Sequence, residues 1–155
     1  MGWFFGFKLH LVINTQGEIM SFHITKGNVD DRVPLDILFK GLRGKVFGDK
    51  GYISKKEFEK YLEQGLQLIT NLKSNMKPKI MPYLDKILLR KRSIIETVND
   101  FLKNTCQIEH TRHRSPFNFF VNLLAGLVAY SKLPKKPSIR IDHPEKLSQE
   151  LVVLG

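Results

Sequence analysis

The segment Val46-Phe47-Gly48-Asp49-Lys50-Gly51-Tyr52 decides how this chain is interpreted. Its two apolar residues predict the end of a short buried strand, and its two glycines allow the backbone turns that end that strand. Asp49 therefore stands just after the carboxyl end of a strand, the edge at which open sheets bind ligands. The alternative is a solvated turn in which Asp49 caps backbone amides, so a functional interpretation needs a second carboxylate elsewhere.

The segments on either side of this strand predict a mixed α/β sheet covered by helices. Alternating apolar residues predict an antiparallel hairpin at the start of the chain, and capping signals predict helices before and after the Asp49 strand. The expected elements are strands 4–13 and 19–25, a helix from residue 34, the Asp49 strand, a helix from Ser54 to Gly65, a strand at 66–70, and helices 84–104 and 117–130.

Two expectations concern the last third of the chain. The apolar composition of residues 117–130 predicts a helix that is buried on nearly every side. Residues 138–155 show no convincing periodicity, so we expect them to form a tail outside a compact domain that spans residues 1–137.

The composition favours a cytoplasmic protein with a polyanionic partner. The 155 residues carry a formal charge of +10, which favours nucleic acid ahead of a membrane surface. No secretory signal is visible, and the longest apolar run is too short to span a bilayer. Cys106, the single cysteine, excludes an internal disulfide and is expected to be a partly buried apolar residue rather than a zinc ligand with His110 and His113.

The second carboxylate is Glu96, on the long predicted helix. At 100° per residue it shares one face with Arg92, Asn99 and Lys103, within about 60°, while apolar residues occupy the opposite side. Such a stripe can be a solvated, ion-paired helix face. However, carboxylates from separate elements, together with nearby basic side chains, are also what metal-dependent phosphodiester chemistry requires. We therefore expect the carboxyl groups of Asp49 and Glu96 to converge.

Four separated motifs carry a resemblance to a known family. They are Gly2-Trp3-Phe4-Phe5-Gly6-Phe7-Lys8-Leu9-His10, Gly27-Asn28-Val29-Asp30-Asp31-Arg32, Gly48-Asp49-Lys50-Gly51-Tyr52, and the spaced set Arg92, Glu96 and Lys103. Over roughly residues 2–137 the chain resembles the C-terminal part of the catalytic domain of DDE-type transposases of bacterial insertion sequences. The resemblance implies an RNase H-like fold, a mixed sheet with flanking helices, here N-terminally truncated.

The resemblance also implies roles for individual residues. Asp49 is similar to the second catalytic aspartate and Glu96 to the catalytic glutamate, and both would hold Mg²⁺, for which Mn²⁺ can substitute. Arg92 and Lys103 resemble the cations that flank this glutamate and act near the DNA phosphates. The implied activity is DNA transposition by a metal-dependent polynucleotidyl transferase, which cuts and joins insertion-sequence DNA, with element ends and target DNA as partners.

The chain departs from the family pattern in two places. Leu89 stands where the family signature has a tyrosine. The family's first catalytic aspartate lies upstream of Gly2, and neither Asp30 nor Asp31 is an obvious substitute, since both resemble loop and capping carboxylates. We therefore expect a truncated copy that is inactive alone, with an unpaired apolar edge on its opening hairpin.

The basic segments predict where DNA would bind. The expected phosphate contacts come from Lys73, Lys77, Lys79, Arg112 and Arg114, although the stretch around the two arginines can equally be a solvated turn. The alternative function is a non-catalytic basic nucleic-acid-binding module of RNase H-like fold. The sequence leaves open whether the protein is a homo-oligomer.

Overall fold

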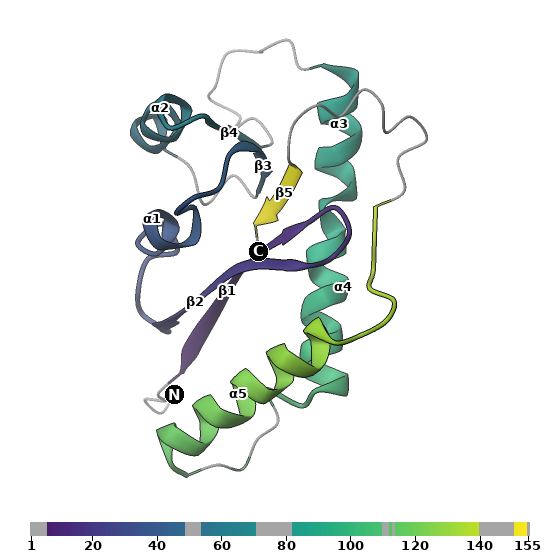
Figure 1. Cartoon of the computed structure of the whole chain (residues 1–155). Coiled ribbons are helices and arrows are strands. Elements are labelled where there is room, and N and C mark those ends of the chain that lie inside the picture. Colours follow the sequence, from purple (N-terminus) through teal and green to yellow (C-terminus); the bar gives the residue numbers. More distant parts are fainter. Residues whose placement is uncertain are drawn as a thin grey trace.

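The computed structural model describes residues 6–48, 54–70, 82–109, 112, 114–139 and 151–154. Within these residues the chain folds as a mixed α/β structure with helices on both faces of one sheet (Figure 1). The predicted class of fold, an α/β sheet with flanking helices, is confirmed at this level.

The described strands form one twisted sheet in the order β2-β1-β5-β3-β4. Their bounds are Phe7–Asn14 (β1), Ile19–Lys26 (β2), Gly44–Phe47 (β3), Leu66–Ile69 (β4) and Leu151–Leu154 (β5). The antiparallel hairpin of β1 and β2 lies where the sequence predicts it, and β3 and β4 occupy two further predicted strands. The structure adds that β3 and β4 pair in parallel.

The turn of the hairpin is built around Asn14. Its side-chain oxygen accepts hydrogen bonds from the backbone N–H groups of Gln16 and Glu18, at 3.0 and 2.9 Å, so the side chain closes the turn. Gly17 has a φ of +75°, and a Cβ there would collide with the carbonyl oxygen of Pro137. The Tyr130 hydroxyl donates a 2.6 Å hydrogen bond to the Gly17 carbonyl, which fastens this turn to the last helix.

The centre of the sheet corrects two expectations. The sequence predicts a tail over residues 138–155, yet β5 lies between the two strand pairs, antiparallel to β1 and parallel to β3 (Figure 1). The Ile139 N–H also donates a 2.7 Å hydrogen bond to the Thr15 carbonyl. The edge of β1 that was expected to be unpaired is therefore occupied by β5 at Val12–Asn14.

The helices follow the predicted order, with bounds that the structure refines. They are α1 (Leu35–Leu38), α2 (Lys55–Glu63), α3 (Tyr83–Arg90), the 3₁₀ turn η2 (Lys91–Ser93), α4 (Ile94–Asp100), the π-helical turn η3 (Phe101–Thr105) and α5 (Pro116–Ser131). The capping box of Ser54 and Glu57 is present at the start of α2, and the hydrogen bonds from Ser54 lower the pKa of the Glu57 carboxyl.

Residues that alternate along β1 face two different cores. Leu11 and Ile13 pack against α4 and α5, with Val98, Leu102 and Leu127 in the same cluster. The residue between them, Val12, faces α1 and α2 on the other side of the sheet. Helices therefore cover this part of β1 on both faces of the sheet.

Helix α5 differs from its prediction. Only one side is buried, through Leu123, Gly126, Leu127 and Tyr130, while large apolar residues on the other side are exposed. Gly126 allows a close approach to the segment after η3, because a Cβ there would lie 2.6 Å from a methyl group of Ile108. None of the helices within the described residues is both long and apolar enough to cross a bilayer.

Candidate active site

Strand β3 leads directly to Asp49. Val46 and Phe47 are buried, and the Gly48 N–H donates a 3.1 Å hydrogen bond to the Ile69 carbonyl, which continues the pairing with β4 by one residue. Because β3 and β4 are parallel, their carboxyl ends lie at one edge of the sheet, and in the sequence Asp49 comes two residues after the last residue of β3. Asp49 itself lies outside the described residues, so its convergence with Glu96 stays a prediction.

The predicted long helix is continuous but irregular from Tyr83 to Thr105. Arg92 lies in the 3₁₀ turn η2, Glu96 in the regular helix α4, and Lys103 in the π-helical turn η3. Mid-helix 3₁₀ and π turns are uncommon and are often associated with functional sites. Both predicted cations therefore occupy irregular turns, and the predicted carboxylate lies on the regular segment between them.

The orientation of this helix agrees with the predicted faces. Ile94, Val98 and Leu102 are buried against the sheet, while Glu96 is exposed. The Lys103 ammonium lies 3.2 Å from a carboxylate oxygen of Glu109, and both side chains are about half exposed. An exposed ion pair of this kind contributes only about 0–1 kcal/mol, so Lys103 can exchange this partner for a phosphate at little cost.

A buried ion pair fastens the Asp49 strand to the Glu96 helix. The Lys45 ammonium on β3 donates to both carboxylate oxygens of Asp85 on α3, at 2.8 and 3.1 Å. The Asp85 side chain is only 4% exposed and that of Lys45 is 22% exposed. The pair was not predicted from the sequence, although a lysine inside an apolar strand is a signal for a buried partner of opposite charge.

A cleft of about 890 Å³ lies beside the polar face of the irregular helix, the face that carries Asn99 and Lys103. Asn99 and Lys103 line one side of it, and β1 residues 7–10 line the other. Two ion pairs line the cleft. The Lys8 ammonium lies 2.9 Å from a carboxylate oxygen of Asp31, and Lys103 pairs with Glu109. The cleft was not predicted, because its walls come from segments that are far apart in the sequence.

One of the residues that line the cleft, His10, is uncharged at neutral pH. His10 is buried, and its Nε2 atom lies 2.9 Å from the Thr25 hydroxyl. Desolvation by burial lowers the pKa of His10 below its ordinary value, so the imidazole stays neutral. Phe7 stacks on Phe119 from α5, with ring centroids 5.4 Å apart, and closes the apolar part of the cleft.

Asp30 and Asp31 are engaged by cations rather than by each other. Asp30 accepts hydrogen bonds from the backbone and the guanidinium of Arg32, which hold the pKa of its carboxyl well below the usual range. Asp31 pairs with Lys8. These contacts agree with the interpretation of both aspartates as loop carboxylates.

Across the described ranges, no three His, Cys, Asp or Glu side chains are arranged to hold a metal ion. Cys106 is partly buried, and burial raises the pKa of its thiol, which disfavours the metal-binding thiolate. Glu96 has the exposure and the donor type that Mg²⁺ uses, since this ion commonly binds through one or two carboxylates and keeps several waters.

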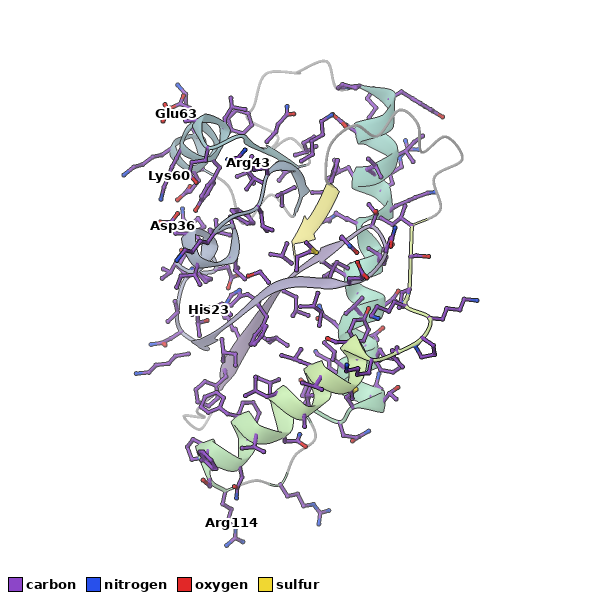
Figure 2. The ribbon with its side chains drawn as sticks, viewed as in Figure 1. His23, Asp36, Arg43, Lys60, Glu63 and Arg114 are labelled. Carbon is purple, nitrogen blue, oxygen red and sulfur yellow. The ribbon has the colours of Figure 1, made fainter. Side chains whose placement is uncertain are left out.

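The predicted DNA-binding residues are only partly described. Arg112 and Arg114 are exposed, and Arg114 also lines the cleft at the start of α5. Figure 2 shows Arg114 projecting outward, at the opposite end of the view from Glu63 on α2. Lys73, Lys77 and Lys79 lie outside the described residues, so their part in DNA binding stays a prediction.

The comparison with known families gives one match. Residues 1–116 match the sequence model of a family described as "Transposase DDE domain", which covers most of the 155 residues. The matched range includes the hairpin, β3, the whole irregular helix and the cations before α5. No curated protein and no solved structure matches the chain. The chain therefore belongs to the transposase DDE domain family.

Proposed function

We propose that the chain carries the metal-binding part of an RNase H-like polynucleotidyl transferase, which cuts and joins insertion-sequence DNA. Family membership already implies DNA transposition, with DNA as the partner. The observation that supports the finer proposal is the position of Glu96. It is exposed on the regular helix between two irregular turns that carry Arg92 and Lys103. The Lys45–Asp85 pair fastens that helix to the strand that leads to Asp49.

Each residue has a defined part in this proposal. The carboxylates of Asp49 and Glu96 hold the metal ion, Mg²⁺ or Mn²⁺, and a bound ion supplies Lewis-acid stabilisation of the attacking and leaving oxygens. Arg92 and Lys103 neutralise the phosphate on either side of Glu96.

Titration with Mn²⁺ tests the proposed metal site directly. The parent chain should bind the ion, and either Asp49→Asn or Glu96→Gln should weaken the affinity at least tenfold, the usual scale for a disturbed metal site. Calorimetry or the paramagnetic resonance of free Mn²⁺ would measure it. Glu63→Gln is the matched control, because it removes an exposed glutamate from α2 and should leave the affinity unchanged.

The same titration separates the proposal from its alternative. If all four proteins bind Mn²⁺ equally, or if none binds it while DNA binding persists, Asp49 and Glu96 are not metal ligands. The chain would then be a non-catalytic basic module that contacts nucleic acid through its charge alone.

DNA binding should be weak, independent of sequence and steeply dependent on salt. If Lys73, Lys77, Lys79, Arg112 and Arg114 each neutralise one phosphate, the logarithmic salt slope should be near −4.5, or about −0.9 per contact. Reversing all five charges to glutamate should abolish duplex binding in a fluorescence anisotropy titration.

A second variant with the same change in net charge controls for this effect. Its five reversed residues are exposed cations of other segments, namely Lys26, Lys40, Arg43, Lys55 and Lys56. This variant should keep most of the affinity and most of the salt slope. Equal losses in the two variants would show that net charge, rather than the named residues, controls DNA binding.

A further inference from the structure

Strand β1 is paired along only part of one of its two edges. On one side, β2 pairs with it from Phe7 to Ile13. On the other side lies β5, whose pairing covers only residues 12–14, close to the hairpin turn (Figure 1). Within the described sheet, the edge of residues 7–11 that faces away from β2 is therefore open, over about 16 Å of strand. Such an edge presents backbone N–H and C=O groups that can pair with another strand.

The cleft beside the irregular helix runs along this open edge. Every residue from Gly6 to His10 lines it. Successive side chains of a strand point to opposite faces of the sheet, so a space that all of these residues border lies beside the strand rather than over one face. A segment that enters the cleft therefore meets the backbone edge of β1.

The two faces of an added strand meet different surroundings. Leu9 packs with the core on the α4 and α5 side of the sheet, where Ile108 and Leu123 also line the cleft. Lys8, the preceding residue of the strand, points to the opposite face and pairs with Asp31. Side chains of an added strand that point toward α5 therefore meet an apolar wall, and the alternate side chains meet the Lys8 ammonium.

The charge of the cleft favours an acidic segment. Its lining includes the cations Lys8, Lys103 and Arg114 and the carboxylates Asp31 and Glu109. Each carboxylate is already paired with one of the lysines, so Arg114 leaves these lining residues with a positive charge in excess. The whole chain has a formal charge of +10, which attracts an acidic partner over a longer range and repels a second copy of the chain.

We propose that the open edge of β1 is a docking site for an extended segment of another polypeptide, in which apolar residues alternate with acidic ones. The segment adds a strand to β1 in line with β5, whose pairing shows that this edge accepts a strand. In this mode of recognition, main-chain hydrogen bonds provide the affinity and the surroundings of alternate side chains provide the specificity. A DNA duplex fits this edge less well, because it has no peptide groups to pair with it. The inference does not depend on whether Asp49 and Glu96 bind a metal ion.

Fluorescence anisotropy with a labelled model peptide tests the mode of binding. The peptide alternates valine and glutamate over about eight residues, and the full 155-residue chain should bind it. Methylating the amide nitrogens of alternate peptide residues removes the N–H groups along one edge of the added strand. Methylation of one alternate set should abolish binding, and methylation of the other set should leave the affinity nearly unchanged. A peptide of the same composition without the alternation should bind about tenfold more weakly or worse.

Charge reversal and hydrogen exchange in the chain test the location. Lys8→Glu should weaken peptide binding about tenfold or more, because it places a like charge against the acidic side chains. Lys56→Glu makes the same change in net charge at an exposed site on α2 and should leave the affinity unchanged. Far-ultraviolet circular dichroism should confirm that both variants fold. Amide hydrogen exchange should show that the peptide protects alternate backbone N–H groups of residues 7–11.

Four results would overturn the proposal. The first is that the alternating peptide does not bind. The second is that methylation of either alternate set leaves binding unchanged, as expected if charge alone attracts the peptide. The third is an equal loss of affinity in Lys8→Glu and Lys56→Glu. The fourth is unchanged exchange at residues 7–11, including the case in which the peptide displaces β5 and protects only residues 12–14.

Discussion

Deletion of residues 151–155 should unfold the chain, although these residues end the sequence and were expected to be part of a tail. Strand β5 is the only connection by strand pairing between the β1–β2 hairpin and the β3–β4 pair within the described sheet. It pairs with Val12–Asn14 on one side and with Lys45–Phe47 on the other.

The expected loss of folding stability is large because the residues of β1 and β3 that pair with β5 are almost fully buried. Val12, Ile13, Val46 and Phe47 are at most 1% exposed, so water has little access to their backbone groups. A buried peptide group that loses its hydrogen-bond partner costs about 1–3 kcal/mol. Several such losses approach the whole stability of a small domain, about 5–15 kcal/mol. The truncated chain should therefore be insoluble or lack fixed tertiary structure.

A single substitution separates the effect of strand pairing from that of chain length. Val152→Pro removes one backbone N–H and should destabilise the full-length chain, although less than the deletion does, whereas Val152→Ile keeps the N–H and should remain folded. Thermal unfolding followed by near-ultraviolet circular dichroism compares them. A truncated chain with the parent's melting temperature would show that β5 is not part of the cooperative fold.

The second large effect is expected from the buried ion pair between β3 and α3. Lys45→Met leaves the Asp85 carboxylate without its cation at a site where that side chain is 4% exposed. Breaking a buried pair from one side typically costs about 3–5 kcal/mol, because the remaining charge is uncompensated. Urea unfolding should therefore show a loss of that size for Lys45→Met, and a comparable loss for Asp85→Asn.

The double variant and an exposed pair provide the controls. Lys45→Met combined with Asp85→Leu should recover most of the stability, because an apolar pair can replace a buried ion pair at little cost. Lys8→Met breaks the pair with Asp31, whose side chains are 39% and 46% exposed, and should cost at most about 1 kcal/mol. If Lys45→Met costs no more than Lys8→Met, the pair does not fasten the strand to the helix.

The elements that could be predicted from the sequence are those set by local patterns. The hairpin, the capping box of α2 and the start of the long helix each follow from residues a few positions apart. Strand β5 could not be predicted in this way, because its four residues are too few for a periodicity and its partners are far away in the chain. Likewise, the composition of α5 shows that the helix can be buried, but not that the chain covers only one of its faces.

The features of the candidate site likewise fall into those that local sequence patterns predict and those that depend on contacts between distant segments. The exposed face of Glu96 was predictable, because it depends on helical periodicity alone. A regular helix was assumed, however, so the 3₁₀ turn at Arg92 and the π turn at Lys103 were not foreseen. The Lys45–Asp85 pair and the cleft arise from contacts between distant segments.

In the proposed site, the end of β3 and the exposed face of α4 share one divalent metal ion. Iron-directed cleavage tests this sharing, because Fe²⁺ bound in place of Mg²⁺ reduces added hydrogen peroxide to hydroxide and a hydroxyl radical, which cuts the backbone close to the ion. Ascorbate returns the resulting Fe³⁺ to Fe²⁺. We expect cuts next to both Asp49 and Glu96, which excess Mg²⁺ suppresses and which are lost in Glu96→Gln. Cuts near only one of these residues, or an unchanged pattern in Glu96→Gln, would contradict the proposed sharing.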